Sequence, residues 1–285
     1  SAMAMGERTP AAIANGPASG RLAIAEAITN IAAARIGPIE KIKLSANWMC
    51  ACGEEGEDAA LFDTVRDLGL NFCPALGVSI PVGKDSMSMR AKWQDAAGEE
   101  HTVVAPLSLV ISAFVGVTDV RRVVTPDLKS DSDTRLLLVD LGHGRNRLGG
   151  STLAQVFNTL GEEVPDVAAA DVRRLFAAVQ SLLDADLLLA YHDRSDGGLF
   201  VTAAEMAFAG RRGLCLELPE EVDALAALYN EEIGALLQVR AADLESVRAT
   251  FAEQGHGACL VDVGAPTADD RLIVRVVAAI GDVAA

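Results

Sequence analysis

The sequence predicts a mixed α/β fold made of two half-domains, each with a sheet and packed helices. Along most of the chain, apolar runs of strand length alternate with stretches whose apolar residues recur at helical spacing. Residues 118–134 break this alternation with charges, a Thr-Pro pair and mixed Ser and Asp, which is typical of a connection between domains. At 285 residues, the chain is long enough for two domains of ordinary size.

In the first half, a helix over residues 18–36 is predicted from apolar residues at helical spacing, with Gly37-Pro38 as its stop signal. The polar segment 83–89, which follows a short apolar strand, is predicted to be a loop. The other elements expected here are a helix over 57–70, strands over 41–47, 77–82 and 107–117, and a hairpin with limbs 88–93 and 102–105.

The second half alternates between strands and helices throughout. A strand over 135–141 opens it, and Gly149-Gly150-Ser151 leads into a helix. The remaining elements expected are helices over 168–186, 199–209, 221–229 and 242–254, and strands over 187–192, 213–218, 235–240, 258–263 and 271–277.

These patterns also place the domain boundaries. Residues 1–5 are mostly small, carry no secretory signal and resemble a cloning scar, so they are expected to lie outside the fold. Residues 6–122 are expected to form the first half-domain, 123–133 the linker, and 134–285 the second half-domain.

Charge and cysteine content exclude several kinds of partner and site. With a formal net charge of −16, the chain lacks the clustered Lys and Arg that hold nucleic-acid backbones. Charged residues break every apolar run well before the ~20 positions that a membrane span requires, so a soluble protein without membrane contact is expected. Five cysteines, an odd number in apolar context, favour reduced thiols and a cytoplasmic location. Cys50 and Cys52 are one residue closer than a metal-binding or redox CxxC pair, so we interpret them as small buried side chains.

Glu26 and Asn30 are a candidate metal-binding pair on the first predicted helix. They are four residues apart, so both side chains project from one face of the helix. A carboxylate and an amide oxygen are hard donors that suit Mg²⁺, which completes its coordination with phosphate and water. The alternative is a solvated helix face, but small and apolar neighbours indicate that this helix is largely buried.

The loop over residues 192–198 is a second candidate site, because it follows an apolar strand and precedes a helix. Asp193 can bind a metal ion, Ser195 can donate a hydrogen bond to phosphate, and Gly197-Gly198 lets backbone amides approach an anion. The alternative is that Ser195 or Asp196 simply caps the following helix. His192 is the one histidine inside a candidate site, and no histidine is paired in sequence with a Ser or Cys nucleophile.

A third candidate is the polar segment after residue 82, which combines a glycine, a cation and hydroxyl groups suited to a phosphorylated substrate. It lacks the first glycine of a P-loop, and a hairpin rather than a helix follows it. A plain hairpin connection is therefore the alternative. The candidate residues of this possible substrate loop are Gly83, Lys84, Asp85, Ser86 and Ser88.

Five motifs occur in a fixed order along nearly the whole chain. They are residues 16–21 (GPASGR), 25–31 (AEAITNI), 43–49 (KLSANWM), 80–89 (IPVGKDSMSM) and 192–199 (HDRSDGGL). Together they closely resemble the large phosphoribosylformylglycinamidine synthases, the ATP- and glutamine-dependent amidotransferases of purine biosynthesis. The resemblance implies the aminoimidazole ribonucleotide synthetase-like fold, present twice in that family, with this chain as the second copy and its N-terminal half truncated.

The resemblance also implies residue roles. Glu26, Asn30 and Asp193 match magnesium ligands, and Ser195 matches a contact to the ATP or ADP held in the second, auxiliary copy. The segment from Gly83 to Ser88 matches a loop near the reaction site, in a register that the resemblance leaves open. A further aspartate ligand and the catalytic histidine would lie upstream of this chain, and a glutaminase domain would follow it.

The implied reaction of the intact enzyme converts formylglycinamide ribonucleotide, ATP and glutamine-derived ammonia to formylglycinamidine ribonucleotide. The implied partners are the substrate, the nucleotide with Mg²⁺, and the rest of the same polypeptide. The chain alone is expected to be inactive and to self-associate, because its first sheet would normally pair with the other copy. Two alternatives stay open: a free-standing ATP-dependent enzyme of the aminoimidazole ribonucleotide synthetase superfamily, and a scaffold stabilised by a nucleotide that is not turned over.

Overall fold

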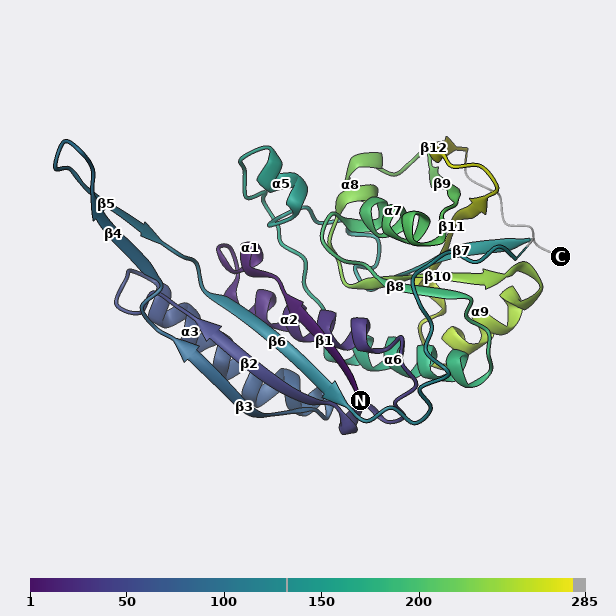
Figure 1. Cartoon of the computed structure of the whole chain (residues 1–285), viewed down its shortest axis with the longest axis horizontal. Helices are drawn as coiled ribbons and strands as arrows, with labels where there is room; N and C mark the ends of the chain where they lie inside the picture. The colour runs from purple at the N-terminus through teal and green to yellow at the C-terminus, as the bar shows by residue number, and fades with distance from the viewer. Residues whose placement is uncertain (132, 279–285) are drawn as a thin grey trace.

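The structure is a computed structural model that describes residues 1–131 and 133–278 (Figure 1). Within these residues, the first part of the chain forms a four-stranded sheet, the second part forms a six-stranded sheet, and a separate hairpin extends from the first part. The mixed α/β fold expected from the sequence is confirmed.

The first sheet has the strand order β1-β6-β2-β3. β6 runs antiparallel to both β1 and β2, whereas β2 and β3 are parallel. Because side chains alternate along a strand, Leu109, Ile111 and Ala113 of β6 all face the core. The strands are β1 (Ala2–Glu7), β2 (Lys43–Met49), β3 (Ser79–Ser86) and β6 (Ser108–Val115).

Residues 2–5 belong to this sheet, so the expectation that residues 1–5 lie outside the fold is wrong for these four. Ala2 lies opposite Val115 and Met5 lies opposite Ser112 in a continuous antiparallel register. Ala4 is buried while Met3 and Met5 are exposed, which is the alternation of a strand with one face on the core. The small residues of this segment therefore fit a strand that packs closely under a helix.

That helix is α2 (Gly16–Ile31), which is mostly buried and covers one face of the first sheet. Asn15 caps its start by accepting a hydrogen bond from the Ala18 N–H at 3.0 Å. Gly6 of β1 lies so close to α2 that a Cβ there would meet the Ala23 carbonyl oxygen at 2.0 Å. The end of β1 is thus held beside the middle of α2. The shorter helices of this half are α1 (Thr9–Ala12), η1 (Ile39–Lys41), α3 (Glu57–Asp67), the π-helix η2 (Leu68–Phe72) and α4 (Cys73–Leu76).

The polar segment predicted as a loop after residue 82 is instead the end of β3. Gly83 lies opposite Ala46 and Ser86 opposite Met49 in parallel register. A Cβ at Gly83 would meet the Ala46 carbonyl oxygen at 2.5 Å, so glycine allows the two backbones to approach. Polar side chains are tolerated here because β3 is an edge strand. The hairpin that follows, β4 (Arg90–Gln94) and β5 (Glu100–Val104), extends away from the sheet (Figure 1).

The second sheet has the order β12-β9-β11-β7-β10-β8, with the edge strand β8 near α2. The Tyr191 hydroxyl of β8 donates a hydrogen bond to the Thr29 carbonyl oxygen of α2 at 2.6 Å. This contact joins the two halves of the chain. The strands are β7 (Thr134–Asp140), β8 (Ala190–Asp193), β9 (Gly213–Pro219), β10 (Gly234–Arg240), β11 (Leu260–Thr267) and β12 (Leu272–Val277).

The two halves share a hydrophobic core. Leu22 and Ile28 of α2 belong to the same buried cluster as Leu137 of β7 and Leu182 of α6, and α6 packs on both α2 and α9. No helix within residues 1–131 and 133–278 is long and apolar enough to cross a bilayer. The helices of this half are α5 (Thr152–Val156), α6 (Ala169–Asp184), α7 (Gly198–Gly210), α8 (Ala224–Tyr229), η3 (Ala241–Asp243), α9 (Leu244–Glu253) and η4 (Gly257–Cys259).

Candidate functional site

Arg8, the residue after β1, lies at the centre of the candidate site between the two halves. Its side chain is buried, with 5% of its surface exposed. One terminal nitrogen lies 3.2 Å from Glu26 Oε1 on α2, and the other forms an ion pair with Asp196 in the loop after β8. Arg8 therefore links the first half of the chain to the loop predicted to carry chemistry.

Around Arg8, the carboxylates outnumber the positive charge of its guanidinium. The charge of Arg8 interacts with four carboxylates, those of Glu26, Asp193, Asp196 and Glu231. The pKa of Glu26 is raised to about 7, chiefly by burial and to a smaller extent by the charges of Asp193 and Asp196, which together outweigh the attraction of Arg8 and a hydrogen bond from the Glu7 N–H. The excess of negative charge suits an additional cation.

The loop after β8 is held by backbone geometry rather than by a capping side chain. Gly197 and Gly198 both have positive φ, 81° and 69°, and a Cβ at Gly198 would meet the Asn230 carbonyl oxygen at 2.5 Å. No side chain caps the start of α7, so Ser195 and Asp196 do not play the capping role considered from the sequence. Glu231 Oε1 instead accepts the Gly197 N–H at 2.8 Å.

Asp193 lies at the end of β8 and Ser195 on the loop that follows it, beside α2. Asp193 ends β8, is buried, and interacts electrostatically with Glu26, so the structure brings these two predicted metal ligands to one place. Ser195 is half-buried, and its carbonyl oxygen accepts the Gly198 N–H at 3.0 Å. Asn30 is exposed in the last turn of α2, one turn beyond Glu26.

A cavity of about 190 Å³ opens beside Arg8. Gly149 and Gly150 form part of its wall, and a Cβ at Gly150 would meet the Ala11 backbone nitrogen at 2.8 Å. A wider hollow of about 510 Å³ shares Pro10, Gly150 and Gln155 with it. The two together form a groove between α1 and the chain around α5, large enough for a small-molecule ligand.

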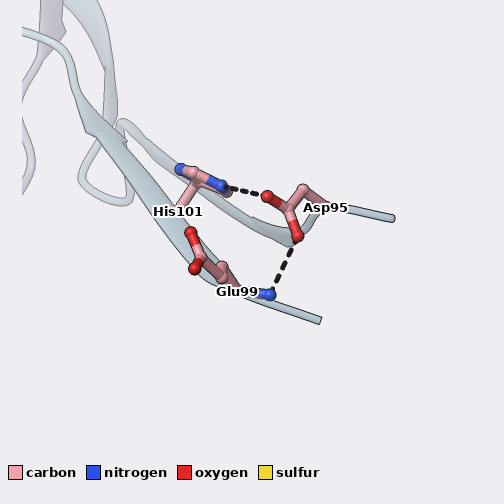
Figure 2. A group of neighbouring side chains, drawn as sticks. All are labelled: Asp95, Glu99 and His101. Atoms are coloured by element: carbon pink, nitrogen blue, oxygen red, sulfur yellow. Dashed lines mark hydrogen bonds and ion pairs between the residues drawn. The ribbon is translucent and has the colours of Figure 1, made fainter. Parts of the chain in front are cut away.

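The carboxylates around Arg8 do not form a closed metal cage. Among the described residues, one set of three has ligand atoms within 4.8 Å of one another, namely Asp95, Glu99 and His101 (Figure 2). Glu26 and Asp193 therefore form an open arrangement. Such a set fits Mg²⁺, which is commonly held by one or two carboxylates and completed by phosphate and water.

The Asp95, Glu99 and His101 group lies at the exposed tip of the hairpin (Figure 2). Asp95 Oδ1 accepts the backbone N–H groups of Ala97 and Glu99, both at 2.9 Å, and His101 Nε2 lies 3.1 Å from Asp95 Oδ2. These bonds close the hairpin turn, which accounts for the grouping without a ligand.

The residues of the possible substrate loop are not brought to the Arg8 site. β3, which carries Gly83, Lys84, Asp85 and Ser86, and β1 are the two opposite edges of the first sheet. Lys84 Nζ donates to Ser86 Oγ at 2.7 Å on the exposed surface. Ser88 is also exposed, just beyond the end of β3.

Arg8 and Glu231 are not among the site residues predicted from the sequence. Arg8 lies three residues beyond the segment 1–5 that was expected to lie outside the fold, although an arginine after alternating small residues could have marked the end of a strand. Glu231 and Glu232 are adjacent and both buried, at 5% and 0% exposed. Nothing in the sequence distinguishes such a buried pair from a solvated one, because its partners are distant in sequence.

Comparisons with protein families divide the chain at the same place as the sheets do. Residues 1–116 match the model of the FGAR-AT PurM_N-like domain. Residues 134–277 match the model of the AIR synthase related protein, C-terminal domain. The two matches together cover most of the chain.

Solved structures share the fold at low sequence identity. PurLQS from Thermotoga maritima superposes with a TM-score of 0.68 at 13% identity, over 96% of this chain and 42% of that one. Phosphoribosylformylglycinamidine synthase II from the same organism gives 0.68 at 13% identity, over 98% and 42%. The hydrogenase maturation protein HypE in complex with ATP gives 0.63 at 18% identity, over 93% and 77%. The chain thus spans about two fifths of the length of the Thermotoga proteins.

Proposed function

Because the chain belongs to the AIR synthase related proteins, we propose that it forms a Mg²⁺-nucleotide site within a phosphoribosylformylglycinamidine synthase. The observation that carries the proposal is the acidic cluster around Arg8, next to a groove between the two halves. The Thermotoga structures include one solved with ATP and one with FGAR, which supports the same ligand classes here.

The residues of the site have separate tasks in this proposal. Glu26 and Asp193 would hold Mg²⁺, with Asn30 as a third oxygen donor at the exposed end of the site. Nucleotide phosphates and these carboxylates are both negatively charged and would repel each other. The ion would supply the positive charge that offsets this repulsion. Ser195 would donate a hydrogen bond to a phosphate oxygen, and Arg8 would keep the two halves in register by its ion pairs.

The whole enzyme would convert formylglycinamide ribonucleotide, ATP and ammonia to formylglycinamidine ribonucleotide in purine biosynthesis. In that reaction the amide oxygen is phosphorylated and ammonia then displaces phosphate. This chain would contribute an auxiliary nucleotide site and one wall, while Lys84 and its neighbours on β3 would face the substrate. Since the chain spans 42% of the Thermotoga synthase, we expect no product from the chain alone with ATP and ammonia.

A second candidate is a free-standing ATP-dependent enzyme. It is favoured by the match to HypE, of which this chain covers 77%. The two candidates differ in what the 285-residue chain does with ATP by itself. Steady release of phosphate from ATP by the chain alone would favour the free-standing enzyme, whereas binding without turnover favours the auxiliary site.

Titration calorimetry of the chain with Mg²⁺-ADP tests the proposed site. Glu26→Gln and Asp193→Asn should each weaken binding about tenfold or more, which corresponds to about 1.4 kcal/mol or more. The thermal stabilisation by the nucleotide should fall in parallel, because at a ligand concentration of 100 times Kd binding stabilises the native state by about 2.7 kcal/mol.

Lys84→Ala is the matched control for this titration. Lys84 is exposed on the opposite edge of the first sheet, so its loss should leave ADP affinity unchanged and instead impair substrate use in the intact enzyme. Equal ADP affinity in wild type, Glu26→Gln and Asp193→Asn would show that the site assignment is wrong.

A further inference from the structure

A second cluster of reactive side chains lies apart from the Arg8 site, where three distant segments meet. His143 follows β7, and Asp171 lies in the first turn of α6. His256 immediately precedes η4, which follows α9, and Cys259 is the last residue of η4. α6 and α9 pack against each other, which brings these segments together (Figure 1). Cys259 and His256 are almost fully buried, at 4% and 2% exposed.

Both imidazole rings turn one nitrogen toward the same sulfur atom. Cys259 Sγ lies 3.6 Å from His143 Nδ1 and 3.9 Å from His256 Nδ1. The other nitrogen of each ring faces Asp171: His143 Nε2 is 3.0 Å from Oδ2, and His256 Nε2 is 3.0 Å from the Asp171 carbonyl oxygen. Asp171 therefore holds each ring with its other nitrogen toward the sulfur.

This arrangement has more lone pairs than protons around the sulfur. If each neutral ring donates its Nε2–H to Asp171, each Nδ1 presents a lone pair toward Cys259. The thiol has one proton and can donate to one of them. His256 Nδ1 otherwise faces the Gly255 carbonyl oxygen at 3.3 Å, which is another acceptor. A buried acceptor without a donor is unfavourable, so a cation at this point would complete the set.

We propose that Cys259, His143 and His256 form a binding site for a borderline-soft divalent metal ion of the Zn²⁺ class. On binding, the thiol releases its proton to solvent, and the metal accepts electron pairs from the thiolate and from both Nδ1 atoms. Asp171 keeps the Nε2–H bonds and orients the two ligands, as carboxylates beside metal-bound histidines do. A thiolate with two imidazoles is a donor set that Zn²⁺ prefers.

The ligand atoms of Cys259, His143 and His256 do not all lie within 4.8 Å of one another, so binding an ion requires the His143 ring to shift. The His143 side chain is 47% exposed, so its ring can move toward an ion that enters from solvent, while the two buried ligands stay in place. Three protein ligands leave a fourth position to water. The ion would join the loop after β7, the start of α6 and the chain after α9, and so would stabilise the second half.

Cobalt substitution provides the test, because Co²⁺ bound to a thiolate gives a charge-transfer absorption that oxygen and nitrogen ligands do not. The reduced, chelator-treated chain is titrated with Co²⁺ and then with Zn²⁺. We expect one Co²⁺ per chain with this absorption, and its loss when Zn²⁺ displaces cobalt. Cys259→Ser should abolish the band, and His143→Gln and Asp171→Asn should weaken binding about 10- to 100-fold.

Two variants control for other sites. Cys215→Ser removes a half-buried thiol on β9 and should leave the band unchanged. His101→Gln removes the histidine of the hairpin group in Figure 2 and should also leave it unchanged. Because His143 is exposed, its variant should fold even if Cys259→Ser does not. Absence of the band in the wild type, its persistence in His143→Gln at unchanged affinity, or its loss in Cys215→Ser or His101→Gln would each overturn the proposal.

Discussion

At the scale of single residues, the pair of Asp140 and Arg194 connects β7 to the loop that carries Asp193. Arg194 is 2% exposed, and its Nη2 lies 2.6 Å from Asp140 Oδ1. Burial by itself would raise the pKa of Asp140, but attraction to Arg194 and the N–H groups of Gly144 and Gly142 lowers it overall. The pair holds the loop of the candidate site in position.

Asp140→Asn should destabilise the chain at neutral pH. Breaking a buried pair leaves the guanidinium of Arg194 without its counter-charge, at a cost of about 3 kcal/mol. The folded-state pKa of Asp140 lies below the unfolded value of about 3.9. The contribution of ionised Asp140 to the free energy of unfolding is therefore present above about pH 4. It is lost as the pH falls through the folded-state pKa of Asp140. Urea unfolding at pH 7 and in acid should show a difference between variant and wild type that shrinks in acid.

The control for this experiment is Asp119→Asn. Asp119 pairs with Arg121 on the surface, where solvent screens the charges, so its loss should change stability little. If Asp140→Asn and wild type had the same urea midpoint at pH 7, the buried pair would not contribute to stability as argued.

At the scale of elements, most helices and strands followed from hydrophobic spacing. α6 (Ala169–Asp184) and β6 (Ser108–Val115) lie within the ranges predicted for them, because each has one face on the core and shows the matching period. The range predicted for β3, residues 77–82, stops short of the end of the strand at Ser86. The exposed end carries polar residues, which resemble a loop when the neighbouring strand is not known. No strand was predicted for β1, because small residues at the start of a chain resemble a cloning scar.

The candidate site was predictable in part. Glu26 and Asp193 were identified from helical spacing, loop position and family motifs, and the structure places them near each other. Arg8 and Asp196 form an ion pair across 188 residues of sequence, and His143 and Cys259 approach across 116. Contacts at such separations depend on how the two sheets pack, which local periodicity does not encode. The approach of His143 to Cys259 was therefore not predictable from the sequence, although His256 lies only three residues from that cysteine.

Gly83→Ala tests whether the end of β3 depends on close approach to β2. The added methyl group would lie 2.5 Å from the Ala46 carbonyl oxygen, a backbone atom that cannot move aside alone. We expect a loss of about 1–3 kcal/mol in the free energy of unfolding. Gly69→Ala is the control: no atom lies within 4 Å of its Cβ position, so chemical denaturation should show no loss. Equal stability of the two variants would contradict the tight β2–β3 packing.

At the scale of the whole molecule, the two halves behave as one folded unit. Arg21 of α2 makes two bonds of 2.8 Å to the Asp166 carboxylate, and Gln180 of α6 donates to the Ala32 and Ala34 carbonyl oxygens at 3.0 and 3.1 Å. With the shared core, these contacts fix the distance between Glu26 and Asp193. The groove beside Arg8 is therefore largely preformed, which would lower the ordering cost of binding the proposed nucleotide.

The first sheet has one covered and one open face, and this asymmetry predicts self-association. α2 packs on the inner face, while Met3, Met5 and Phe114 are exposed on the outer one, at 67%, 56% and 43%. Met3 lies directly opposite Phe114 across the β1–β6 pair, so the apolar surface is continuous. We expect a second copy of the chain to cover it, as the first synthetase copy would in an intact synthase.

Sedimentation at micromolar concentration should show a monomer–dimer equilibrium. The net charge of −16 repels a second copy, so raising the ionic strength should strengthen the dimer if apolar contact drives it. Replacing both Met3 and Phe114 by Lys should give monomers, because two charges would be buried in the contact. Phe208→Lys changes an equally apolar side chain, 71% exposed on α7, and should leave the dimer intact. A monomer at all salt concentrations, or a dimer that survives the double substitution, would exclude this face as the contact.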